Sequence, residues 1–351
     1  MSGFVYTIVK LIVKTGLYTY HKKIEITGLE NISEDKPVIF LPNHQSALID
    51  VLLIATDCRR KPYFLTRSDV FSSSLLNRVF SYFRMLPIYR MRDGRETLVN
   101  NNFIFDTCSE ILNRGEALVI FPEANHNLQR RVRTLSKGFT RIILRSFELN
   151  PNLDIQLIPV GLNYKNAVNF PDEVSVHFGK PISAKSLYDA EDVNKSSRTI
   201  KNKVSSSLKK LTTHIPKKID YDATINRLAY EKISFLNPEL VNDKIQSYIN
   251  ENVVDTVESL PKVEAKEYNF LKIIFVGLNF PIVLLWRLWL KPKVPEDEFM
   301  GTFRFAFGLI FFPVYLLLIF ITISLSLNMG IALFAVCLLL VLNLLLAKFG
   351  L

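Results

Sequence analysis

A histidine and an aspartate that follow a short apolar segment are the residues of this chain best suited to chemistry. The apolar segment covers 37–41, and His44 and Asp50 come shortly after it, with five residues between them. Histidine is the commonest side-chain base at neutral pH, and a carboxylate on its second ring nitrogen would fix its tautomer and stabilise the imidazolium. Such a pair can take the proton from an attacking hydroxyl group.

The spacing of this pair limits where the histidine can lie. Six residues along an ideal helix rotate a side chain by about 240°, so His44 and Asp50 cannot share one helical face. They can meet only if His44 lies in the turn before a helix and Asp50 in its first turn, where Ser46 is suited to cap the helix. Taken alone, an ordinary contact at a helix N-terminus explains this spacing equally well.

A second polar group ends another apolar segment, at 117–121. The sequence Phe-Pro-Glu-Ala-Asn-His occupies 121–126. In α/β proteins, binding and catalytic sites usually lie at the carboxyl ends of the strands. The alternative for Glu123 is a structural contact with a helix N-terminus, and the alternative for Arg133 and Lys137, four residues apart, is the solvated face of a helix.

Short apolar segments alternate with stretches of helical spacing between residues 36 and 164. This alternation predicts an α/β fold, with a mixed sheet flanked by helices. The predicted strands are 37–41, 63–65, 117–121, 155–162 and 174–178, and the predicted helices are 47–56, 69–83, 96–112 and 192–213.

Four sequence blocks in this order resemble the glycerolipid acyltransferase family, which includes the lysophosphatidic acid acyltransferases. The blocks are Asn-His with a later Asp at 43–50, Leu-Pro-Ile-Tyr-Arg at 86–90, Phe-Pro-Glu at 121–123 with Lys-Gly at 137–138, and Ile-Pro-Val at 158–160. Two departures stand out. Five residues rather than four separate His44 from Asp50, and Ala124-Asn125-His126 replaces the usual Gly-Thr-Arg, so that the family's phosphate-contacting arginine is absent there.

The resemblance implies a role for each matching residue. His44 would be the general base and Asp50 its orienting carboxylate, with no metal and no cofactor other than the co-substrate, acyl-CoA or acyl-ACP. Cationic side chains would bind the acceptor's phosphate, and Glu123 would bind an acceptor hydroxyl or position those cations. The implied substrate-binding residues are Arg90, Glu123, Asn125, His126, Arg133 and Lys137.

The reaction implied by the resemblance is an O-acylation in phospholipid biosynthesis. The simplest acceptor is 1-acylglycerol 3-phosphate, a form of lysophosphatidic acid, which would give phosphatidic acid. Glycerol 3-phosphate, another lysophospholipid and a lyso-aminolipid remain open as acceptors. The competing class is a catalytically silent protein that binds lipid or acts as a scaffold.

Two long uncharged segments near the C-terminus predict a membrane anchor. Residues 305–327 and 331–347 carry no charge, and each is close to the length of about 20 residues that crosses a hydrocarbon core. We therefore expect a transmembrane hairpin, with flanking Lys and Arg placing both ends and the catalytic domain on the cytoplasmic side. The net charge of +10 fits anionic membrane lipids as partners, and no nucleic-acid motif is present.

The composition along the chain predicts four regions. Residues 1–23 have the pattern of an interfacial helix, equally consistent with an amphipathic helix packed on the domain. Residues 24–218 would form the acyltransferase domain, 219–268 a charged helical connector and 269–351 the membrane region. Within the last, 269–290 would be interfacial or re-entrant, with a third crossing left open, and removal of everything after Gly301 should release the protein from membranes.

Overall fold

The computed structural model describes residues 2–71, 73–90, 99–251 and 270–351. Its described part is built on an eight-stranded sheet with the order β1-β7-β6-β2-β5-β3-β4, and β8 pairs with β6. Strands β6, β2, β5, β3 and β4 run parallel, and β7 is antiparallel to β6, so the predicted mixed sheet is confirmed. The strands are β1 Lys23–Thr27, β2 Val38–Pro42, β3 Tyr63–Arg67, β4 Met85–Ile88, β5 Ala117–Val119, β6 Gln156–Tyr164, β7 Glu173–Phe178 and β8 Ile182–Ser183.

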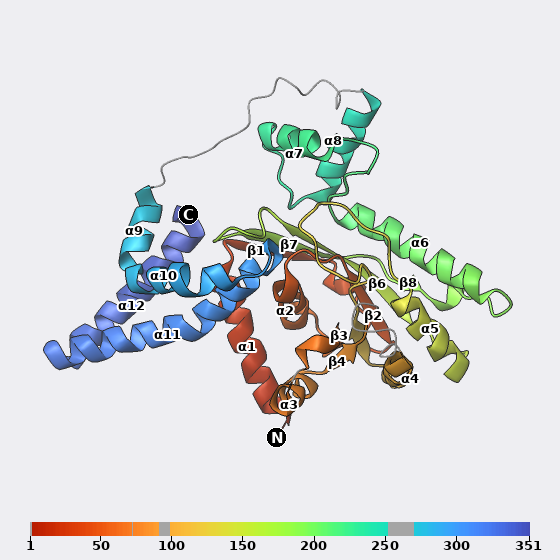
Figure 1. The fold of residues 1–351 in the computed structure, drawn as a ribbon, viewed down its shortest axis with the longest axis horizontal. Coiled ribbons are helices and arrows are strands. Elements are labelled where there is room, and N and C mark those ends of the chain that lie inside the picture. Colours follow the sequence, from red (N-terminus) through yellow and green to blue (C-terminus); the bar gives the residue numbers. More distant parts are fainter. Residues whose placement is uncertain (1, 72, 91–98, 252–269) are drawn as a thin grey trace.

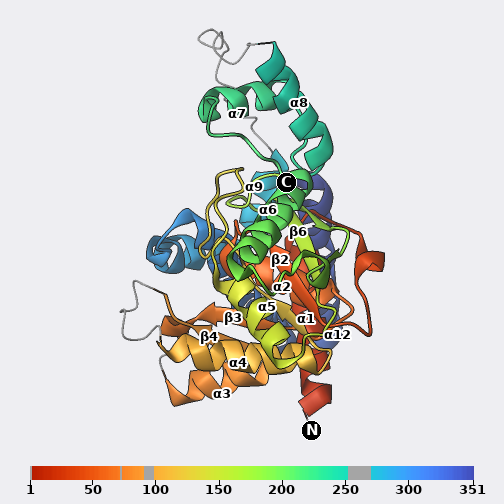
Figure 2. The ribbon, with the colours of Figure 1, turned by 90° about the vertical axis from the view of Figure 1, so that its right-hand side faces the viewer.

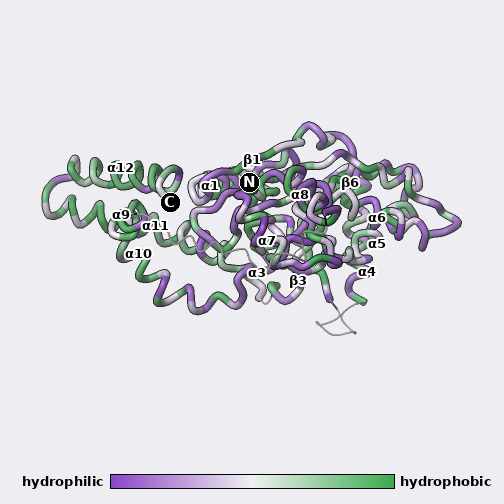
Figure 3. Tube along the Cα trace, turned by 90° about the horizontal axis from the view of Figure 1, so that it is seen from above, coloured by the Kyte–Doolittle hydropathy of each residue, from purple (hydrophilic) through white to green (hydrophobic). Residues whose placement is uncertain are grey.

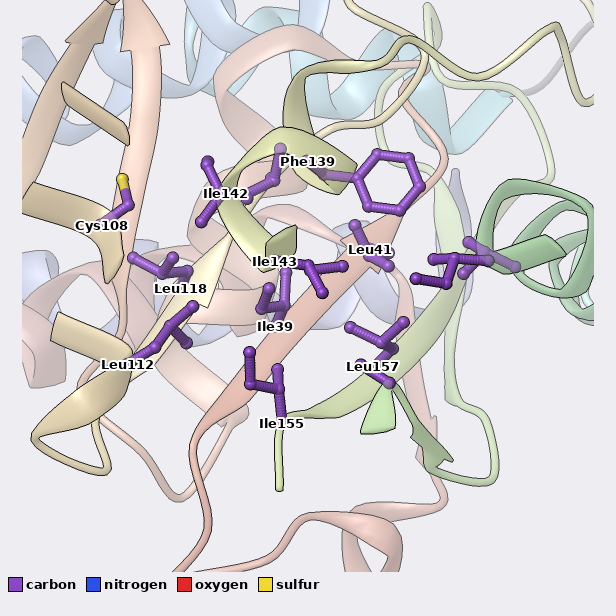
Figure 4. Close-up of a cluster of buried hydrophobic side chains, with 14 of the residues drawn as sticks. Ile39, Leu41, Cys108, Leu112, Leu118, Phe139, Ile142, Ile143, Ile155 and Leu157 are labelled. Atoms are coloured by element: carbon purple, nitrogen blue, oxygen red, sulfur yellow. The ribbon is translucent and has the colours of Figure 1, made fainter. Parts of the chain in front are cut away.

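Helices cover both faces of the sheet, because the central strands are apolar on both sides. Along β2, Ile39 and Leu41 pack toward one layer of helices and Val38 and Phe40 toward the other, as the two-residue period of a strand requires. Figure 4 shows Ile39 and Leu41 among the side chains of the first layer. That layer contains α4 Asn100–Asn113, α5 Gly138–Leu149 and α6 Val193–Leu211, and the opposite layer contains α1 Ser2–Tyr20 and α2 Ala47–Asp57.

Several elements differ from the sequence prediction. Only Ser74–Tyr82 of the predicted helix 69–83 forms an α-helix, α3, after a short turn of 3₁₀ helix at Ser68–Val70. Serines compete with helical hydrogen bonding, and this segment contains several. Helix α5, the short β8 and both edge strands were not predicted; β4 contains Pro87, which an edge tolerates. The start of the predicted helix 96–112 lies outside the described residues.

Two helices after the α/β domain form a small unit of their own. Helices α7, Tyr221–Tyr230, and α8, Pro238–Asn250, pack through a buried cluster that includes Leu228, Val241 and Ile245. Figures 1 and 2 show this pair beyond one end of the sheet, next to α6. The remainder of the predicted connector, 252–268, lies outside the described residues.

The C-terminal helices are separate from the sheet and mostly apolar (Figure 3). Helices α11, Met300–Ser326, and α12, Met329–Leu345, pack along each other, and each lies in a helical stretch long and apolar enough to cross a membrane. Before them, α9, Phe270–Leu278, and α10, Phe280–Leu285, belong to a helix pair bent by 92°, which is the geometry of a broken span or a re-entrant loop.

The C-terminal helices are packed directly onto the α/β domain. The backbone N–H of Leu48 donates to Thr302 Oγ1 at 3.1 Å, and Phe305 is buried in the same cluster as Leu17 of α1. At the other end of the hairpin, Lys348 Nζ donates to two carbonyl oxygens at the end of α1, those of Tyr18 and His21, both at 2.6 Å. The start of α11 therefore touches α2, the helix that carries Asp50.

Candidate active site

Parallel strands bring most of the predicted site residues to one edge of the sheet. The carboxyl ends of β2, β5, β3 and β4 lie at the same edge, and His44, Glu123 and Arg90 follow β2, β5 and β4 respectively. Because neighbouring strands lie about 4.8 Å apart, β4 is roughly 14 Å from β2. His44 and Glu123 are thus on neighbouring strands, and Arg90 lies at the far end of the row.

The structure places His44 in contact with Asp50. His44 Nδ1 lies 2.8 Å from Asp50 Oδ2; the carboxylate is fully buried, and the imidazole is 14% exposed. Asp50 Oδ2 also accepts from the backbone N–H groups of Gln45 and Ser46, at 2.8 and 2.9 Å. An ionised carboxylate can only accept, so Nδ1 carries the proton and Nε2 is left with a lone pair.

The extra residue between His44 and Asp50 is absorbed by one strained turn. Ala47 has a φ of 37°, and the N–H of Ile49 donates to the carbonyl of Ser46 at 2.9 Å. A positive φ is unfavourable for a residue with a Cβ atom. Ser46 occupies the N-cap position of α2 but its side chain forms no capping hydrogen bond, so the expected cap was wrong; Asp50 Oδ2 instead accepts from the backbone N–H groups of Gln45 and Ser46, just before the helix.

The imidazole is also held by a contact on its ring face. Its ring stacks on Phe121 with the centroids 4.0 Å apart, and the N–H of Asn127 donates to the His44 carbonyl at 3.0 Å. The side-chain amide of Asn43 extends the pairing of β2 with β6: its Oδ1 accepts from the N–H of Leu162 at 2.7 Å and its Nδ2 donates to that residue's carbonyl at 3.0 Å. The residues that follow β2 and β5 therefore fix the position of the His44 ring.

Glu123 and Asn125 hold Arg133. Glu123 Oε2 accepts from Arg133 Nε at 3.1 Å and from Nη2 at 2.8 Å, and Oε1 accepts from the Arg133 backbone N–H at 3.0 Å. The Asn125 side-chain and backbone oxygens accept further hydrogen bonds from the same guanidinium. Glu123 is 8% exposed. Of the two roles considered for Glu123, this geometry is that of a carboxylate which positions a cation.

His126 lies beside His44 and contacts the segment that precedes α11. The two imidazole rings meet edge to face with centroids 5.6 Å apart. His126 Nε2 is 3.2 Å from Glu296 Oε2, and the His126 ring packs on Phe299 at 4.6 Å. The segment before α11 therefore forms one side of the site.

The other two predicted cations lie apart from this group. Arg90 Nη2 is 3.4 Å from Asp69 Oδ2, and the same carboxylate binds the guanidinium of Arg67. Lys137 is exposed at the N-cap position of α5. The structure thus gathers His44, Asp50 and the Glu123–Arg133 group, and it leaves Arg90 and Lys137 outside this group.

Sequence reasoning missed the residues that reach the site from distant parts of the chain. Tyr164, at the end of β6, is buried, and its hydroxyl donates to Asp50 Oδ1 at 2.5 Å. Burial, and then the neighbouring Asp50, raise the pKa of this phenol well above its ordinary value, so it stays a donor. A tyrosine at the end of an apolar strand was a usable signal, whereas nothing in the sequence linked Glu296, Phe299 or Thr302 to His44.

The hollow beside His44 is small and polar. Its volume is about 10 Å³, enough for one water molecule, and Asn127, Gln129 and Arg131 contribute to its lining. Within the described ranges, no group of three or more His, Cys, Asp and Glu side chains could hold a metal ion. The chemistry that this arrangement offers is proton transfer at Nε2 of a partly exposed, oriented imidazole.

Comparison with known proteins shows that this chain is similar to acyltransferases. The acyltransferase family model matches residues 23–163. Over 160 residues the chain is 27% identical to a chloroplastic 1-acyl-sn-glycerol-3-phosphate acyltransferase of Arabidopsis thaliana, which covers 45% of this chain and 41% of the relative. Over 161 residues it is 25% identical to human mitochondrial glycerol-3-phosphate acyltransferase 1, covering 43% and 19%. The chain therefore spans less than half the length of these relatives.

A solved structure is also similar. The crystal structure of the 1-acyl-sn-glycerophosphate acyltransferase of Thermotoga maritima gives a TM-score of 0.41 at 18% identity, and the match covers 59% of this chain and 81% of that one.

Proposed function

We propose that this chain is a membrane-bound O-acyltransferase of the glycerolipid acyltransferase family, supported by the match of residues 23–163 to the acyltransferase family model. It transfers a fatty acyl group from acyl-CoA or acyl-ACP to the hydroxyl of a lysoglycerolipid. One observation carries the proposal: His44 Nδ1 binds a buried Asp50 that accepts three further hydrogen bonds from described groups, which leaves Nε2 available as a base.

In this reaction no enzyme nucleophile is needed, because a thioester is already an activated acyl donor. The acceptor hydroxyl attacks the thioester carbonyl while His44 Nε2 takes its proton. The carbon–sulfur bond then breaks and the thiol leaves with coenzyme A or the carrier protein. Asp50 stabilises the imidazolium, and general-base catalysis of this kind contributes about 10² to 10⁴ in rate.

The acceptor that best fits the family is 1-acylglycerol 3-phosphate, with phosphatidic acid as the product. Arg133 would bind the phosphate through a guanidinium already oriented by Glu123 and Asn125, since arginine offers a forked donor set to phosphate oxygens. Lys137 and Arg90 would add charge at the edge of the site. His126 would stand where the family has arginine.

The pairing of cationic side chains with carboxylates favours a second class of acceptor. Arg133 binds Glu123 and Arg90 binds Asp69, so that both arginines have a carboxylate nearby. This reduces the attraction for a doubly charged phosphate. A zwitterionic lysophospholipid or a lyso-aminolipid is therefore the alternative acceptor, and glycerol 3-phosphate the remaining one.

The location we propose is an integral membrane protein with its catalytic domain in the cytoplasm. Two helical stretches are long and apolar enough to span a bilayer, and α1 exposes Phe4, Leu11 and Ile12, as an interfacial helix would. The flanking charges Arg287, Lys291 and Lys348 favour the cytoplasmic side for both ends of the hairpin.

The test is thiol release by the purified full-length protein in detergent. With acyl-CoA or acyl-ACP and an acceptor panel of lysophosphatidate, glycerol 3-phosphate, a zwitterionic lysophospholipid and a lyso-aminolipid, the wild type should release free thiol with one acceptor above the others. His44→Ala should abolish release, and His177→Ala, on β7, should not. Wild-type protein that binds lipid but releases no thiol with any pairing would instead support the scaffold.

A further inference from the structure

A large cavity lies between α1 and the C-terminal helices, apart from the site at His44. Its volume is about 1150 Å³, above the roughly 300 to 1,000 Å³ typical of small-molecule sites. Its walls come from α1, the loop at 168–171, α9, α10, α11 and α12, and they are mostly apolar. Where α11 meets α2, a Cβ on Gly301 would come within 3.1 Å of Ser46 Oγ, so these helices are in close contact there.

The charged side chains that line this cavity are all cationic. They include Arg287, Lys291 and Arg304, and no aspartate or glutamate side chain is among the lining residues. In the described part of the chain, Arg287 and Lys291 form no ion pair with a carboxylate, and Arg304 donates to the Val168 carbonyl at 3.1 Å. Apolar walls with basic groups and no acidic side chain suit an amphiphile with an anionic head group.

A buried amide in the cavity wall has an unused acceptor. Asn279, at the bend between α9 and α10, is 2% exposed. Its Nδ2 donates to the Phe275 carbonyl at 2.9 Å and to Asn343 Oδ1 at 2.5 Å, but its Oδ1 has no partner among the described residues. A buried carbonyl oxygen without a donor is unfavourable. A hydroxyl group on a bound lipid would satisfy it.

We propose that this cavity binds one molecule of an anionic phospholipid whose head group carries hydroxyls, of the phosphatidylglycerol class. Its acyl chains lie among the apolar walls, and its phosphate lies near Arg287, Lys291 and Arg304. The lipid would join α1 to α11 and so support the first turn of α11, where Thr302 binds the N–H of Leu48. This site is independent of the proposed acyl transfer.

A glycine in the cavity wall allows a direct test. Gly308 lines the cavity, and a Cβ placed on it has no atom within 4 Å, so Gly308→Leu puts an apolar side chain into the lipid's space without a clash at its Cβ. Gly277 on α9 is equally free of neighbours but does not line the cavity, which makes Gly277→Leu the matched control. Native mass spectrometry of the full-length proteins with added phosphatidylglycerol should show one retained lipid on the wild type and the control, and none on Gly308→Leu.

Equal retention by Gly308→Leu, or equal retention of phosphatidylcholine by the wild type, would overturn the proposal. A charge variant tests it separately, and stays informative if Gly308→Leu does not fold. Arg287→Gln with Lys291→Gln should weaken phosphatidylglycerol binding roughly 30-fold, and Lys293→Gln, whose ammonium lies over the Trp289 ring outside the cavity, should not. Unchanged binding by the double variant would also contradict the proposal.

Discussion

Tyr164 and Asp50 are 114 residues apart in the chain and are joined by a 2.5 Å hydrogen bond from the phenol to the carboxylate. The bond connects the end of β6 to the first turn of α2. It leaves Asp50 with donors on both carboxylate oxygens, so the carboxylate cannot rotate away from His44. The orientation of the proposed base therefore depends on a strand that the catalytic motif does not contain.

Replacing Tyr164 by phenylalanine should lower kcat without changing the KM for the acceptor. The variant removes one donor from the buried Asp50, and a hydrogen bond to a charged group is worth about 1.5 to 3 kcal/mol. We expect a fall of about tenfold in kcat, measured by thiol release. Tyr230→Phe, at an exposed tyrosine of α7, is the matched control. Full activity of Tyr164→Phe would show that the other donors suffice to hold Asp50.

Asp50→Asn should lower kcat by about 10³-fold. The amide fits the same space but, by donating to His44 Nδ1, favours the tautomer that has its proton on Nε2, where it cannot act as a base. The same measurement with Asp57→Asn, at the other end of α2, should show near wild-type turnover. Comparable losses in the two variants would argue for a general effect on the helix.

Ala124→Gly should stabilise the protein by roughly 1 kcal/mol. Ala124 is exposed and has a φ of 68°, a left-handed conformation that costs a residue with a Cβ atom about 1 to 2 kcal/mol and costs glycine little. Thermal unfolding in detergent measures the effect. Ala223→Gly, in the regular helix α7, should shift stability in the opposite direction. An unchanged or lower melting temperature for Ala124→Gly would contradict the expectation.

His214 should make the fold less stable as pH falls from 6.5 to 4. Its Nδ1 accepts from the N–H of Val132 at 3.1 Å, and burial, then Lys209 and Arg131, lower its pKa to about 4 from the ordinary 6.5. The unfolded chain therefore binds a proton first, so the stability that His214 contributes above pH 6.5 is lost by pH 4. With allowance for solvent screening of this partly exposed ring, we expect a loss of about 1 to 2 kcal/mol in the free energy of unfolding.

The measurement is the difference between wild type and His214→Asn in thermal unfolding at pH 7.5 and pH 5. Asparagine retains an acceptor for the N–H of Val132 but does not titrate. Other buried titrating groups, including Asp172, are the same in both proteins, so their contributions cancel in the difference. Identical pH dependence of the two proteins would exclude His214 as a source of acid sensitivity.

Removal of the hairpin should release a folded protein from membranes only if the truncated chain keeps the first turns of α11. Phe305 is 5% exposed in the core beside α1, and its loss in a truncation after Gly301 would cost about 3 to 5 kcal/mol. A chain ending at Phe312 keeps that packing. We expect this shorter chain to become extractable from membranes by alkaline carbonate, with an unchanged circular dichroism spectrum of the α/β domain. Continued resistance to extraction would show that α1, α9 and α10 suffice to hold it.

The sequence alone determined the features that depend on local pattern. Alternating apolar segments predicted the central strands β2, β5 and β6, because strands buried on both faces are apolar throughout. The long uncharged segments 305–327 and 331–347 predicted the two apolar helices. The spacing of His44 and Asp50 required a loop histidine and a first-turn aspartate, and the structure has that arrangement.

Only the tertiary structure decided what surrounds that pair. Edge strands such as β1 and β4 are polar or contain proline, so they depend on a neighbouring strand more than on their own pattern. Tyr164, Glu296 and Thr302 reach the site across long stretches of chain, and no local period encodes such contacts. The pairing of Arg133 with Glu123 and of His126 with Glu296 was likewise fixed by packing, because the sequence alone does not show which polar side chains come into contact.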